Sequence, residues 1–440
     1  LSFDYIFNMK NLYYFKLCFL VCTLIGCDSA ENKVNSIPFE KLTTEYTGIN
    51  FSNIITPNLE SSENLFDYDY FYNGSGVGIA DINNDGLKDI IFTANQDKNK
   101  LYLNKGNLIF EDITDSSNIN SENKRWSSGV TFADINNDGW LDIYISQGGP
   151  NQPNLRKNLL LINNQDLTFT DMALEYGLDD EGISTQSAFF DFDKDGDLDC
   201  VVMNENEFYG YDPISFFEKY KDKSVLMANS SHLYEQIDGK FTNITEKAGL
   251  LSPTFGLGLC ISDINNDNWP DIYIANDYYV KDAMYINNHD GTFTNQIQES
   301  TKQISFYGMG VDIEDINNDN LSDIFVLDMA SSDHVRSKTL MASMNTSNFD
   351  LITNKLDQHY QYMFNSLQLN LGNNKYHNIS HQLNMAKTDW SWAGLIFDYN
   401  LDGNEDIFVT NGYRKYGSDN DSRIKINQTK IEYNNRVPLE

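Results

Sequence analysis

Cysteine, histidine and positive charge are all scarce in this chain of 440 residues. It contains five cysteines and six histidines, and its 31 basic residues stand against 64 acidic ones, for a formal net charge of −33. A chain this acidic repels phosphate backbones and anionic lipids, which argues against nucleic-acid binding and against adsorption to membranes. Apolar runs are short as well, and none beyond the amino-terminal region is apolar enough to cross a bilayer.

The familiar catalytic motifs are also missing. The sequence has no Gly-x-Ser-x-Gly elbow, no phosphate-binding loop, no dinucleotide fingerprint and no His-Glu-x-x-His. His377 and His381 lie four residues apart around an expected turn, and we interpret them as an incidental pair. We therefore assign no catalytic residue and no organic cofactor, and we expect the chain not to be an enzyme.

Three of the five cysteines lie in an amino-terminal segment that is typical of export. Residues 17–26 are mostly apolar but too few to span a bilayer, as in the central region of a signal peptide. Leu24-Ile25-Gly26-Cys27 resembles a bacterial lipobox, in which the cysteine is lipidated; the alternative is an ordinary signal peptide with an incidental cysteine. We expect residues 1–27 to form a leader with lipidation at Cys27, and residues 28–37 to form a polar tether.

The leader predicts an exported protein, held at the bacterial outer membrane only through its lipid. The two remaining cysteines, Cys200 and Cys260, lie in apolar, strand-like runs. Such positions favour buried thiols over a disulfide. The stability of the fold must then have another source.

One acidic nine-residue segment recurs six times without gaps. Its copies begin at residues 81, 134, 191, 263, 315 and 398, so that successive copies start 52 to 83 residues apart. The first reads Asp81-Ile-Asn-Asn-Asp-Gly-Leu-Lys-Asp89, and the others keep aspartate at the first, fifth and ninth positions. A repeat of roughly fifty residues is typical of a β-propeller, with insertions in the third and fifth units.

Strand signals surround each copy of the segment. An apolar run follows it, as in Ile90-Ile-Phe-Thr93, and a run with glycine or small residues precedes it, as in Ser128-Gly-Val-Thr-Phe132. Glycine within a strand indicates close approach of another backbone or a crowded axis. A hairpin such as Leu101 to Phe110 comes next, which makes four strands per unit. The sequence therefore predicts an all-β fold, a β-propeller of six to seven blades with helical or loop insertions.

The sixth unit lacks the second hairpin. Residues Phe39 to Phe51 resemble the last strand of a unit, and we expect the amino terminus to complete the last blade and protect its edge. The propeller is expected over residues 38–412. Residues 413–440 then read as the start of a further segment of a truncated chain.

The recurrent segment has the chemistry of a calcium loop. Carboxylates or carboxamides at positions 1, 3, 5 and 9, with a backbone carbonyl at position 7, surround one point with hard oxygen donors, as Ca²⁺ requires. No cysteine or histidine takes part, and magnesium demands a stricter octahedron, so zinc, copper and magnesium are disfavoured. The expected ligands are Asp81, Asn83, Asp85, Leu87, Asp89, Asp134, Asn136, Asp138, Trp140, Asp142, Asp191, Asp193, Asp195, Asp197, Asp199, Asp263, Asn265, Asp267, Trp269, Asp271, Asp315, Asn317, Asp319, Leu321, Asp323, Asp398, Asn400, Asp402, Asn404 and Asp406.

Position 6 of the segment is restricted to two residue types. It is Gly86, Gly139, Gly196, Asn268, Asn320 and Gly403. Glycine and asparagine most easily adopt left-handed backbone angles, so a sharp turn is expected there. Position 12 is apolar and never glutamate, which excludes an EF-hand. We expect about six structural calcium ions rather than regulatory ones.

These segments resemble the FG-GAP/VCBS repeats of the integrin-α-like calcium propellers. Asp357-Gln-His-Tyr-Gln-Tyr-Met363, Thr388-Asp-Trp-Ser-Trp-Ala393 and Asn411-Gly-Tyr-Arg414 are similar to a subgroup of Bacteroidetes-type lipoproteins that often carry an ASPIC-type carboxy-terminal domain. The resemblance implies surface or periplasmic binding and adhesion, with a seventh blade and further sequence beyond Glu440.

The two insertions are the expected functional surfaces. Residues 204–231 and 329–365 are rich in aromatic residues or methionine, suited to glycan stacking or protein contacts; the alternative is that they pack on the propeller itself. Trp126, Trp390 and Trp392 are expected either to rim the channel or to join the core between blades. The leading hypothesis is a binding or adhesion module for a protein or carbohydrate. The alternatives are a polysaccharide lyase or hydrolase, or a scaffold for a missing carboxy-terminal functional domain.

Overall fold

The computed structural model describes residues 39–58, 60–65, 67–120, 125–150, 153–339, 346–412, 424–425 and 428. The chain divides into two compact units, Leu1–Lys41 and Leu42–Glu440. The leader, Cys27 and the tether are outside the described residues, as is most of 413–440. The helices and strands of the described residues all belong to the second unit. No helix in its described part is long and apolar enough to span a bilayer.

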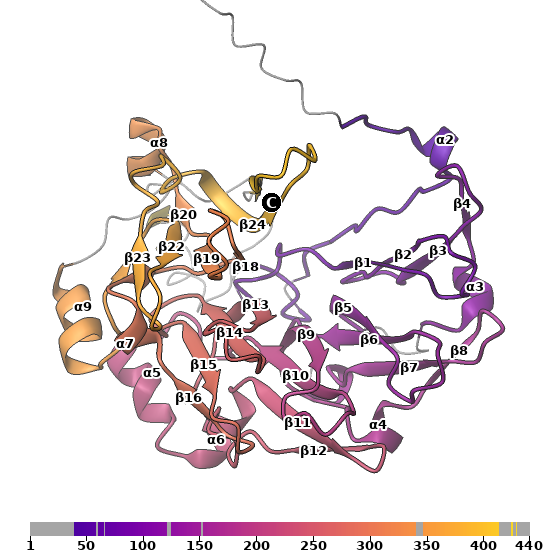
Figure 1. The fold of residues 1–440 in the computed structure, drawn as a ribbon, viewed down its shortest axis with the longest axis horizontal. Coiled ribbons are helices and arrows are strands. Elements are labelled where there is room, and N and C mark those ends of the chain that lie inside the picture. Colours follow the sequence, from indigo (N-terminus) through magenta and orange to yellow (C-terminus); the bar gives the residue numbers. More distant parts are fainter. Residues whose placement is uncertain are drawn as a thin grey trace, which may run out of the picture. The chain divides into compact units, whose positions relative to one another are not determined.

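The second unit is a six-bladed β-propeller, as the sequence predicted (Figure 1). Six antiparallel blades lie in a ring, and in five of them four strands pair in the order of the sequence. Blades 1 and 2 consist of β1 (Val77–Ala80), β2 (Asp89–Phe92), β3 (Lys100–Asn104), β4 (Phe110–Asp112), β5 (Ser127–Ala133), β6 (Asp142–Gln147), β7 (Leu159–Asn163) and β8 (Phe169–Asp171). Blades 3 and 4 consist of β9 (Ser184–Phe190), β10 (Asp199–Asn204), β11 (His232–Ile237), β12 (Lys240–Asn243), β13 (Gly256–Ser262), β14 (Asp271–Asn276), β15 (Ala283–Asn287) and β16 (Phe293–Asn295).

The sixth blade is smaller than the others. Blade 5 consists of β18 (Val311–Glu314), β19 (Asp323–Val326), β22 (Ser366–Asn370) and β23 (Tyr376–Asn378). Blade 6 has β24 (Asp389–Phe397) and β25 (Asp406–Asn411), and β20 (Met329–Ala330) pairs with the start of β24. The missing second hairpin was expected, but the pairing of β20 was not. Two further strands, β17 (Ile304–Ser305) and β21 (Gln361–Tyr362), pair in parallel; in the sequence they directly precede β18 and β22 of blade 5.

Helical segments are short and lie between strands. The longest are α5 (Pro213–Lys219) and α6 (Lys223–Ala228) in the third-unit insertion, and α8 (His334–Thr339), α9 (Thr346–Asp350) and the π-helix Leu351–Lys355 in the fifth. The others are α2 (Thr44–Thr47), α3 (Thr114–Ser117), α4 (Ala173–Tyr176), α7 (Ile297–Ser300) and a 3₁₀ turn, Pro153–Leu155. Both insertions therefore contain helices, in agreement with the sequence.

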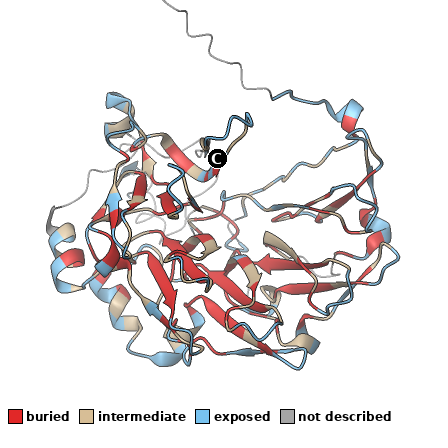
Figure 2. Cartoon of the chain, viewed as in Figure 1, coloured by how far each residue is buried: buried red, intermediate tan, exposed pale blue. Residues whose placement is uncertain are grey.

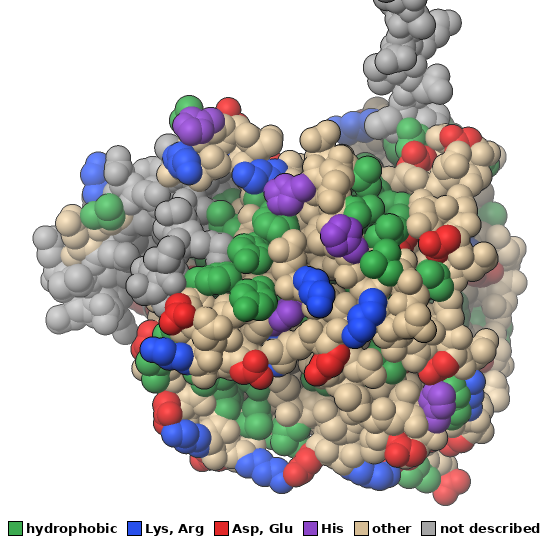
Figure 3. Space-filling view, turned by 60° about the vertical axis from the view of Figure 1, so that its left-hand side comes forward, with side chains coloured by type: hydrophobic (Ala, Val, Ile, Leu, Met, Phe, Trp, Pro, Cys, Tyr) green, Lys and Arg blue, Asp and Glu red, His purple; other side chains and the backbone are tan. Residues whose placement is uncertain are grey.

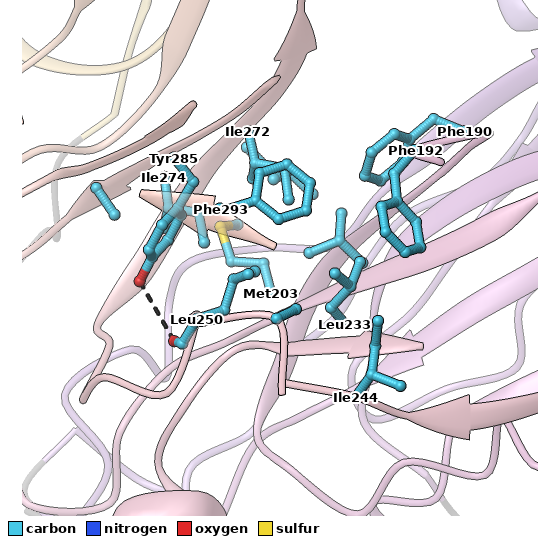
Figure 4. Packing of buried hydrophobic residues seen from close by; sticks show 14 residues of the cluster. Phe190, Phe192, Met203, Leu233, Ile244, Leu250, Ile272, Ile274, Tyr285 and Phe293 are labelled. Atoms are coloured by element: carbon cyan, nitrogen blue, oxygen red, sulfur yellow. Dashed lines mark hydrogen bonds between the residues drawn. The ribbon is translucent and has the colours of Figure 1, made fainter. Parts of the chain in front are cut away.

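Apolar side chains between adjacent blades form the core. Every residue of β6, β10 and β14, the second strands of blades 2 to 4, is buried (Figure 2), which explains the apolar run in the middle of each strand. Figure 4 shows the core between blades 3 and 4, where Phe192 and Met203 of one blade pack with Ile272 and Phe293 of the next. Cys200 is buried and Cys260 is half-buried, and both are free thiols, as expected.

Glycines allow the innermost strands to approach one another. A Cβ atom at Gly76 would lie 2.6 Å from the carbonyl oxygen of Ser128 in the next blade, and one at Gly258 would lie 2.8 Å from the backbone nitrogen of Val311. Gly129 faces the carbonyl of Thr185 in the same way. The crowded axis that the sequence predicted is therefore present, and it leaves no room for side chains at these positions.

The amino-terminal segment does not form the strand that we expected over residues 39–51. Among the described residues it forms α2, which ends at Gly48 with φ of 79°. Gly48 packs on the backbone of Phe110 in blade 1, as Gly177 packs on Phe241 and Gly249 on Phe293. The segment thus repeats the turn that links one blade to the next, and it contacts blade 1 through stacking of Phe51 on Phe92 at 4.8 Å.

The facing surfaces of blades 6 and 1 stay exposed. Val77 and Ile79 of β1 are 57% and 63% exposed, and Leu395 of β24 and Phe408 of β25 are 50% and 43% exposed. The residue that corresponds to Phe408 is buried in the other five blades, as Ile91, Tyr144, Val201, Tyr273 and Phe325. In the described chain, buried apolar clusters therefore join each blade to the next from blade 1 to blade 6, and none joins blade 6 to blade 1.

A buried ion pair reinforces the third blade. His232 of β11 contacts the Asp180 carboxylate through Nδ1 and the Met227 carbonyl through Nε2 at 2.8 Å, so both ring nitrogens face acceptors. The same carboxylate accepts a hydrogen bond from the Tyr234 hydroxyl at 2.7 Å. Burial disfavours the charge, but the Asp180 carboxylate raises the pKa of His232 above its usual value. Burial likewise opposes the charge of Asp180, whose pKa is nevertheless lowered by His232.

Replacement of Gly129 should test the crowding at the axis. We expect Gly129→Ala to lower the free energy of unfolding by about 1–3 kcal/mol, because its Cβ would meet the Thr185 carbonyl. Val77→Ala, at an exposed position of β1, is the matched control and should change the free energy of unfolding far less. Urea unfolding measures this free energy for both variants. Equal stability of Gly129→Ala and the parent would show that the strands can move apart freely.

The His232–Asp180 pair predicts a pH dependence of stability. The pKa of His232 is higher in the folded state than in the unfolded state, where it is about 6.5. The stabilisation that protonated His232 provides is therefore complete below about pH 6.5 and is lost as the pH rises through the folded-state pKa. We expect His232→Gln to be less stable than the parent by up to ~3 kcal/mol at pH 6, with a smaller difference at pH 8.5. Urea unfolding across this range checks it, with the exposed His377→Gln as control. A difference that grows with pH would contradict the prediction.

Candidate metal loops and the axial pocket

The six repeated segments form equivalent loops that join the first and second strands of each blade. We call them loop 1 (81–89), loop 2 (134–142), loop 3 (191–199), loop 4 (263–271), loop 5 (315–323) and loop 6 (398–406). In loop 1, Asp81 accepts hydrogen bonds from the backbone nitrogens of Asp85 at 3.2 Å and Gly86 at 2.8 Å. Asp85 in turn accepts from the nitrogen of Leu87 at 2.8 Å. These bonds curl the loop around its own side-chain oxygens.

Two positions in every loop have left-handed backbone angles. At position 6 the φ angles lie between 66° and 101°, which confirms the turn predicted from glycine and asparagine. Position 4 is left-handed as well, with φ between 56° and 62°, at Asn84, Asn137, Lys194, Asn266, Asn318 and Leu401. We did not predict this second turn. The asparagines at four of these six positions were the available signal.

Loop 3 brings its carboxylates closest together. Oxygens of Asp191, Asp193 and Asp195 lie within 4.8 Å of one another. One oxygen of Asp191 and one of Asp197 are buried without a hydrogen-bond partner among the described residues. A buried oxygen without a donor is costly unless a cation meets it. The residues of this loop therefore fit a cation that prefers hard oxygen donors, as Ca²⁺ does.

The aspartate at position 9 takes a different place from the rest of the loop. Asp89 is buried at the start of β2 and accepts from the backbone nitrogens of Ile82 at 3.0 Å and Asn104 at 2.7 Å. The same two bonds recur in loops 2 to 5, at Asp142, Asp199, Asp271 and Asp323. This carboxylate thus ties the loop to the third strand of its own blade, whatever else it binds.

Burial also changes the acidity of these position-9 side chains. It raises the pKa of Asp142 and Asp323 to about 6 and that of Asp199 and Asp271 to about 7, with a further contribution from neighbouring carboxylates. Backbone hydrogen bonds oppose the rise without cancelling it. The loops therefore concentrate carboxyl groups in partly dry surroundings.

Loops 4 and 6 differ from the common arrangement. In loop 4, His289 lies 2.8 Å from Asp267 and stacks on Trp269. In loop 6, Asp406 accepts from the side chain of Asn400 at 3.3 Å, since the third strand that supplies the donor elsewhere is absent from the described part of blade 6. The sequence predicted six equal sites, whereas the structure makes loop 6 the most exposed.

The loops of neighbouring blades contact each other through position 4. Asn84 donates to the carbonyl of Gly139 in loop 2 at 3.0 Å, and Asn266 donates to that of Asn320 in loop 5 at 2.7 Å. Between loops 3 and 4, the Lys194 ammonium lies 4.5 Å from the ring centre of Trp269. Anything that orders one loop therefore also orders part of its neighbour.

The aromatic residues gather at the opposite ends of the innermost strands. Phe216 of α5 is fully buried and stacks on Phe255 with ring centres 5.3 Å apart, and Tyr220 lies edge-on to it at 4.9 Å. This cluster also contains Phe71 and Trp126. Most of the insertion 204–231 thus packs on the propeller, as the alternative interpretation held, and its exposed side chains include Tyr211.

A pocket remains open on the axis at this end. It has a volume of about 180 Å³ and is lined by residues of all six blades, of which Trp126, Glu205, Met309 and Trp392 carry the longest side chains, and by Tyr68 and Tyr70 of the segment before β1. Trp126 and Trp392 therefore rim the channel, one of the two predicted alternatives, while Trp390 lines a smaller cavity beside β20. Glu205, Tyr68 and Tyr70 were not predicted as site residues.

Two buried carboxyl groups hold the tyrosines of this pocket. The Tyr68 hydroxyl donates to Glu205 at 2.9 Å, and the Tyr70 hydroxyl donates to Asp277 at 2.8 Å. Burial raises the pKa of Glu205 to about 8. An acidic residue directly after the buried strand β10 was the sequence signal for this site, but the fold alone brings Tyr68 to it across 137 positions.

Basic side chains are scattered over the face of the described chain that Figure 3 shows. On the face shown in Figure 3, lysine and arginine side chains lie singly among acidic ones, while apolar side chains gather near its middle. The ion pairs of the described chain are mostly exposed lysine–carboxylate contacts, such as Lys98–Asp115 at 3.2 Å. This arrangement agrees with the expectation of no nucleic-acid partner without testing it.

Sequence comparison identifies the repeats. The FG-GAP-like repeat matches residues 71–145 and 263–326, which include loops 1, 2, 4 and 5. Cartilage acidic protein 1 of Xenopus tropicalis is 32% identical over 132 residues, which cover 30% of this chain. The chain spans about a fifth of the length of that relative, since the match covers 20% of it.

Solved structures are similar to this chain at low sequence identity. A lectin of Agrocybe aegerita, described by its specific recognition of non-reducing terminal N-acetylglucosamine, is 16% identical with a TM-score of 0.41, covering 76% of this chain and 73% of the lectin. The V. cholerae biofilm matrix protein Bap1 is 16% identical with a TM-score of 0.31, covering 59% of this chain and 35% of that protein. The chain thus carries FG-GAP-like repeats, and its strand pairing is that of a six-bladed β-propeller.

Proposed function

We propose that this protein is a non-enzymatic, calcium-stabilised binding module of the bacterial cell exterior, which recognises a protein or a glycan. The observation that carries the calcium assignment is loop 3, where three carboxylates converge and two buried oxygens lack donors. The other loops share its backbone, with the same two left-handed positions. About six structural ions would then occupy the ring.

Calcium would supply positive charge, of which the chain has little. The formal net charge is −33, and each loop brings three or more carboxylates or carboxamides together. Their mutual repulsion opposes folding, and a bound Ca²⁺ would offset it. Since neighbouring loops contact each other through Asn84, Asn266 and Asn318, ions in successive loops would stabilise the junctions between blades as well as the blades.

The ligand would bind at the end of the propeller opposite the loops. That end carries the aromatic cluster, the axial pocket and exposed aromatic side chains such as Tyr211. Aromatic faces bind both sugars and protein side chains. An export leader with lipidation at Cys27 would hold this surface at the outer membrane.

The arrangement favours binding over catalysis. A lyase or hydrolase that uses calcium would need a cluster of tyrosine, lysine, arginine or histidine beside the ion at one mouth of the channel. In the first blade, the pocket residue Gly76 and the loop residue Asp81 lie at opposite ends of β1, which separates them by roughly 16 Å at ~3.3 Å per residue. The tyrosines of the pocket are therefore far from the loops. The role of a scaffold for a further carboxy-terminal domain is compatible with the same calcium chemistry.

Calcium removal should destabilise the protein. We expect excess EGTA to lower the melting temperature by at least several degrees, because a site held at 100 times its Kd contributes about 2.7 kcal/mol. Asp191→Asn should reduce the number of calcium ions bound, measured by isothermal titration, and should shrink the thermal shift. Asp115→Asn, at an exposed carboxylate outside the loops, is the control. No thermal shift with EGTA, or an equal shift restored by Mg²⁺ alone, would refute the calcium assignment.

Ligand binding should depend on calcium through the fold. We expect the calcium-loaded protein to bind selected structures on a glycan array or a panel of extracellular proteins, and to lose that binding in EGTA. Heat-denatured protein is the control for non-specific adhesion. Hydrolysis or elimination products released from a polysaccharide panel would instead favour the enzymatic alternative.

A further inference from the structure

Glu205 is a buried acid that the proposed structural role of calcium does not use. It follows the last residue of β10, it is 3% exposed, and it lines the axial pocket. The Tyr68 hydroxyl is the one donor that reaches its carboxyl group among the described residues. Burial of a carboxyl group with so few hydrogen-bond donors lowers the stability of the fold. Such a residue at the wall of a cavity is therefore a candidate for a functional role.

The groups around Glu205 are mostly acidic or aromatic. Asp277 adds a second carboxylate from the end of β14, and Tyr209 and Tyr70 add hydroxyls. The guanidinium of Arg156 is the cation that acts on Glu205, but it donates to the Glu181 carbonyl at 3.3 Å and also acts on Glu207, Glu181 and Asp180. Acidic groups thus outnumber basic ones around Glu205.

Aromatic rings form the rest of the wall. The rings of Tyr68 and Trp126 meet edge to face, with centres 5.9 Å apart, and Tyr68 and Tyr209 meet similarly at 6.2 Å. Gly149 packs against Trp126, so the tryptophan is held in place. An organic cation is attracted by aromatic faces and by a carboxylate together, and it is favoured further when water is excluded.

We propose that the axial pocket binds the ammonium group of an amine-bearing ligand, with Glu205 as its counter-ion and Tyr68 and Trp126 as its walls. The cavity of about 180 Å³ is large enough for one such group. The proposal rests on the proposed binding function and names the ligand chemistry. An amino sugar and a lysine side chain both carry an ammonium group, and the pocket recognises its positive charge.

The pocket also predicts the pH dependence of binding. Because burial raises the pKa of Glu205 to about 8, the empty pocket is mostly neutral at pH 6.5, and a cation must displace the proton. Affinity should therefore rise with pH as the carboxyl group ionises. A quaternary ammonium ion keeps its charge at every pH, so that its binding reports the protein group alone.

The test is a titration of the calcium-loaded protein with tetramethylammonium and with neutral tert-butanol, followed by the fluorescence of the tryptophans. We expect tetramethylammonium to bind at least about tenfold more tightly at pH 8.5 than at pH 6.5, with release of a proton, and tert-butanol not to compete. Glu205→Gln should weaken binding at pH 8.5 at least about tenfold and remove the pH dependence. Glu181→Gln, which removes one charge that acts on Arg156 but lies outside the pocket lining, should stay within about twofold of the parent.

Two further ligands distinguish the sources of the amine. Glucosamine against N-acetylglucosamine tests an amino sugar, and a lysine-containing peptide against its acetylated form tests a protein amine. Equal binding of charged and neutral members in both pairs, or a pH-independent affinity for tetramethylammonium in the parent protein, would overturn the proposal. That outcome would leave the calcium dependence and array binding of the proposed function unaffected. If Glu205→Gln fails to fold, the pH profile and proton release of the parent still decide.

Discussion

The propeller depends on one carboxylate in each blade, the aspartate that begins the second strand. In blades 1 to 5, Asp89 and its equivalents accept one backbone hydrogen bond from the start of the loop and another from the end of the third strand. The loop, the second strand and the third strand are thereby held by one buried side chain. Since this group is acidic and lies beside other carboxylates, the same contact that shapes the blade also accumulates charge. Under the proposed function, a bound divalent cation would offset this charge.

The two ends of the ring differ in their side chains, and the length of the first strand of each blade separates them. One end carries polar loops whose backbone is set by two left-handed residues. The other carries the insertions, and there the aromatic cluster covers the ring while Tyr68 and Tyr70 reach the axis. Glycines such as Gly76 and Gly258 bring the innermost strands close enough that the channel narrows to a pocket. The position of Glu205 in that pocket gives this end a chemistry of its own.

Blades 6 and 1 differ from the other neighbouring blades in the apolar contact between them. Elsewhere an apolar residue of the second strand is covered by the next blade, whereas Phe408 and Leu395 remain exposed opposite Val77 and Ile79. Blade 6 lacks a third strand in the described chain, and its loop is the one in which the position-9 aspartate has no backbone donor from that strand. The exposed faces and the smaller blade thus coincide, and the described residues contain no hairpin after β25.

The sequence by itself predicted a propeller of six to seven blades, the four strands in each complete blade and the loops between their first two strands, and the structure settled the number of blades at six. These features come from local patterns: a nine-residue repeat, alternating apolar runs, and glycine or asparagine where a left-handed turn is required. Local patterns could not show that the aspartate at position 9 turns inward to a third strand some fifteen residues later, as Asp89 does toward Asn104. Nor could they place Tyr68 on Glu205, because that contact joins segments 137 positions apart that only the packing of several blades around a crowded axis brings together.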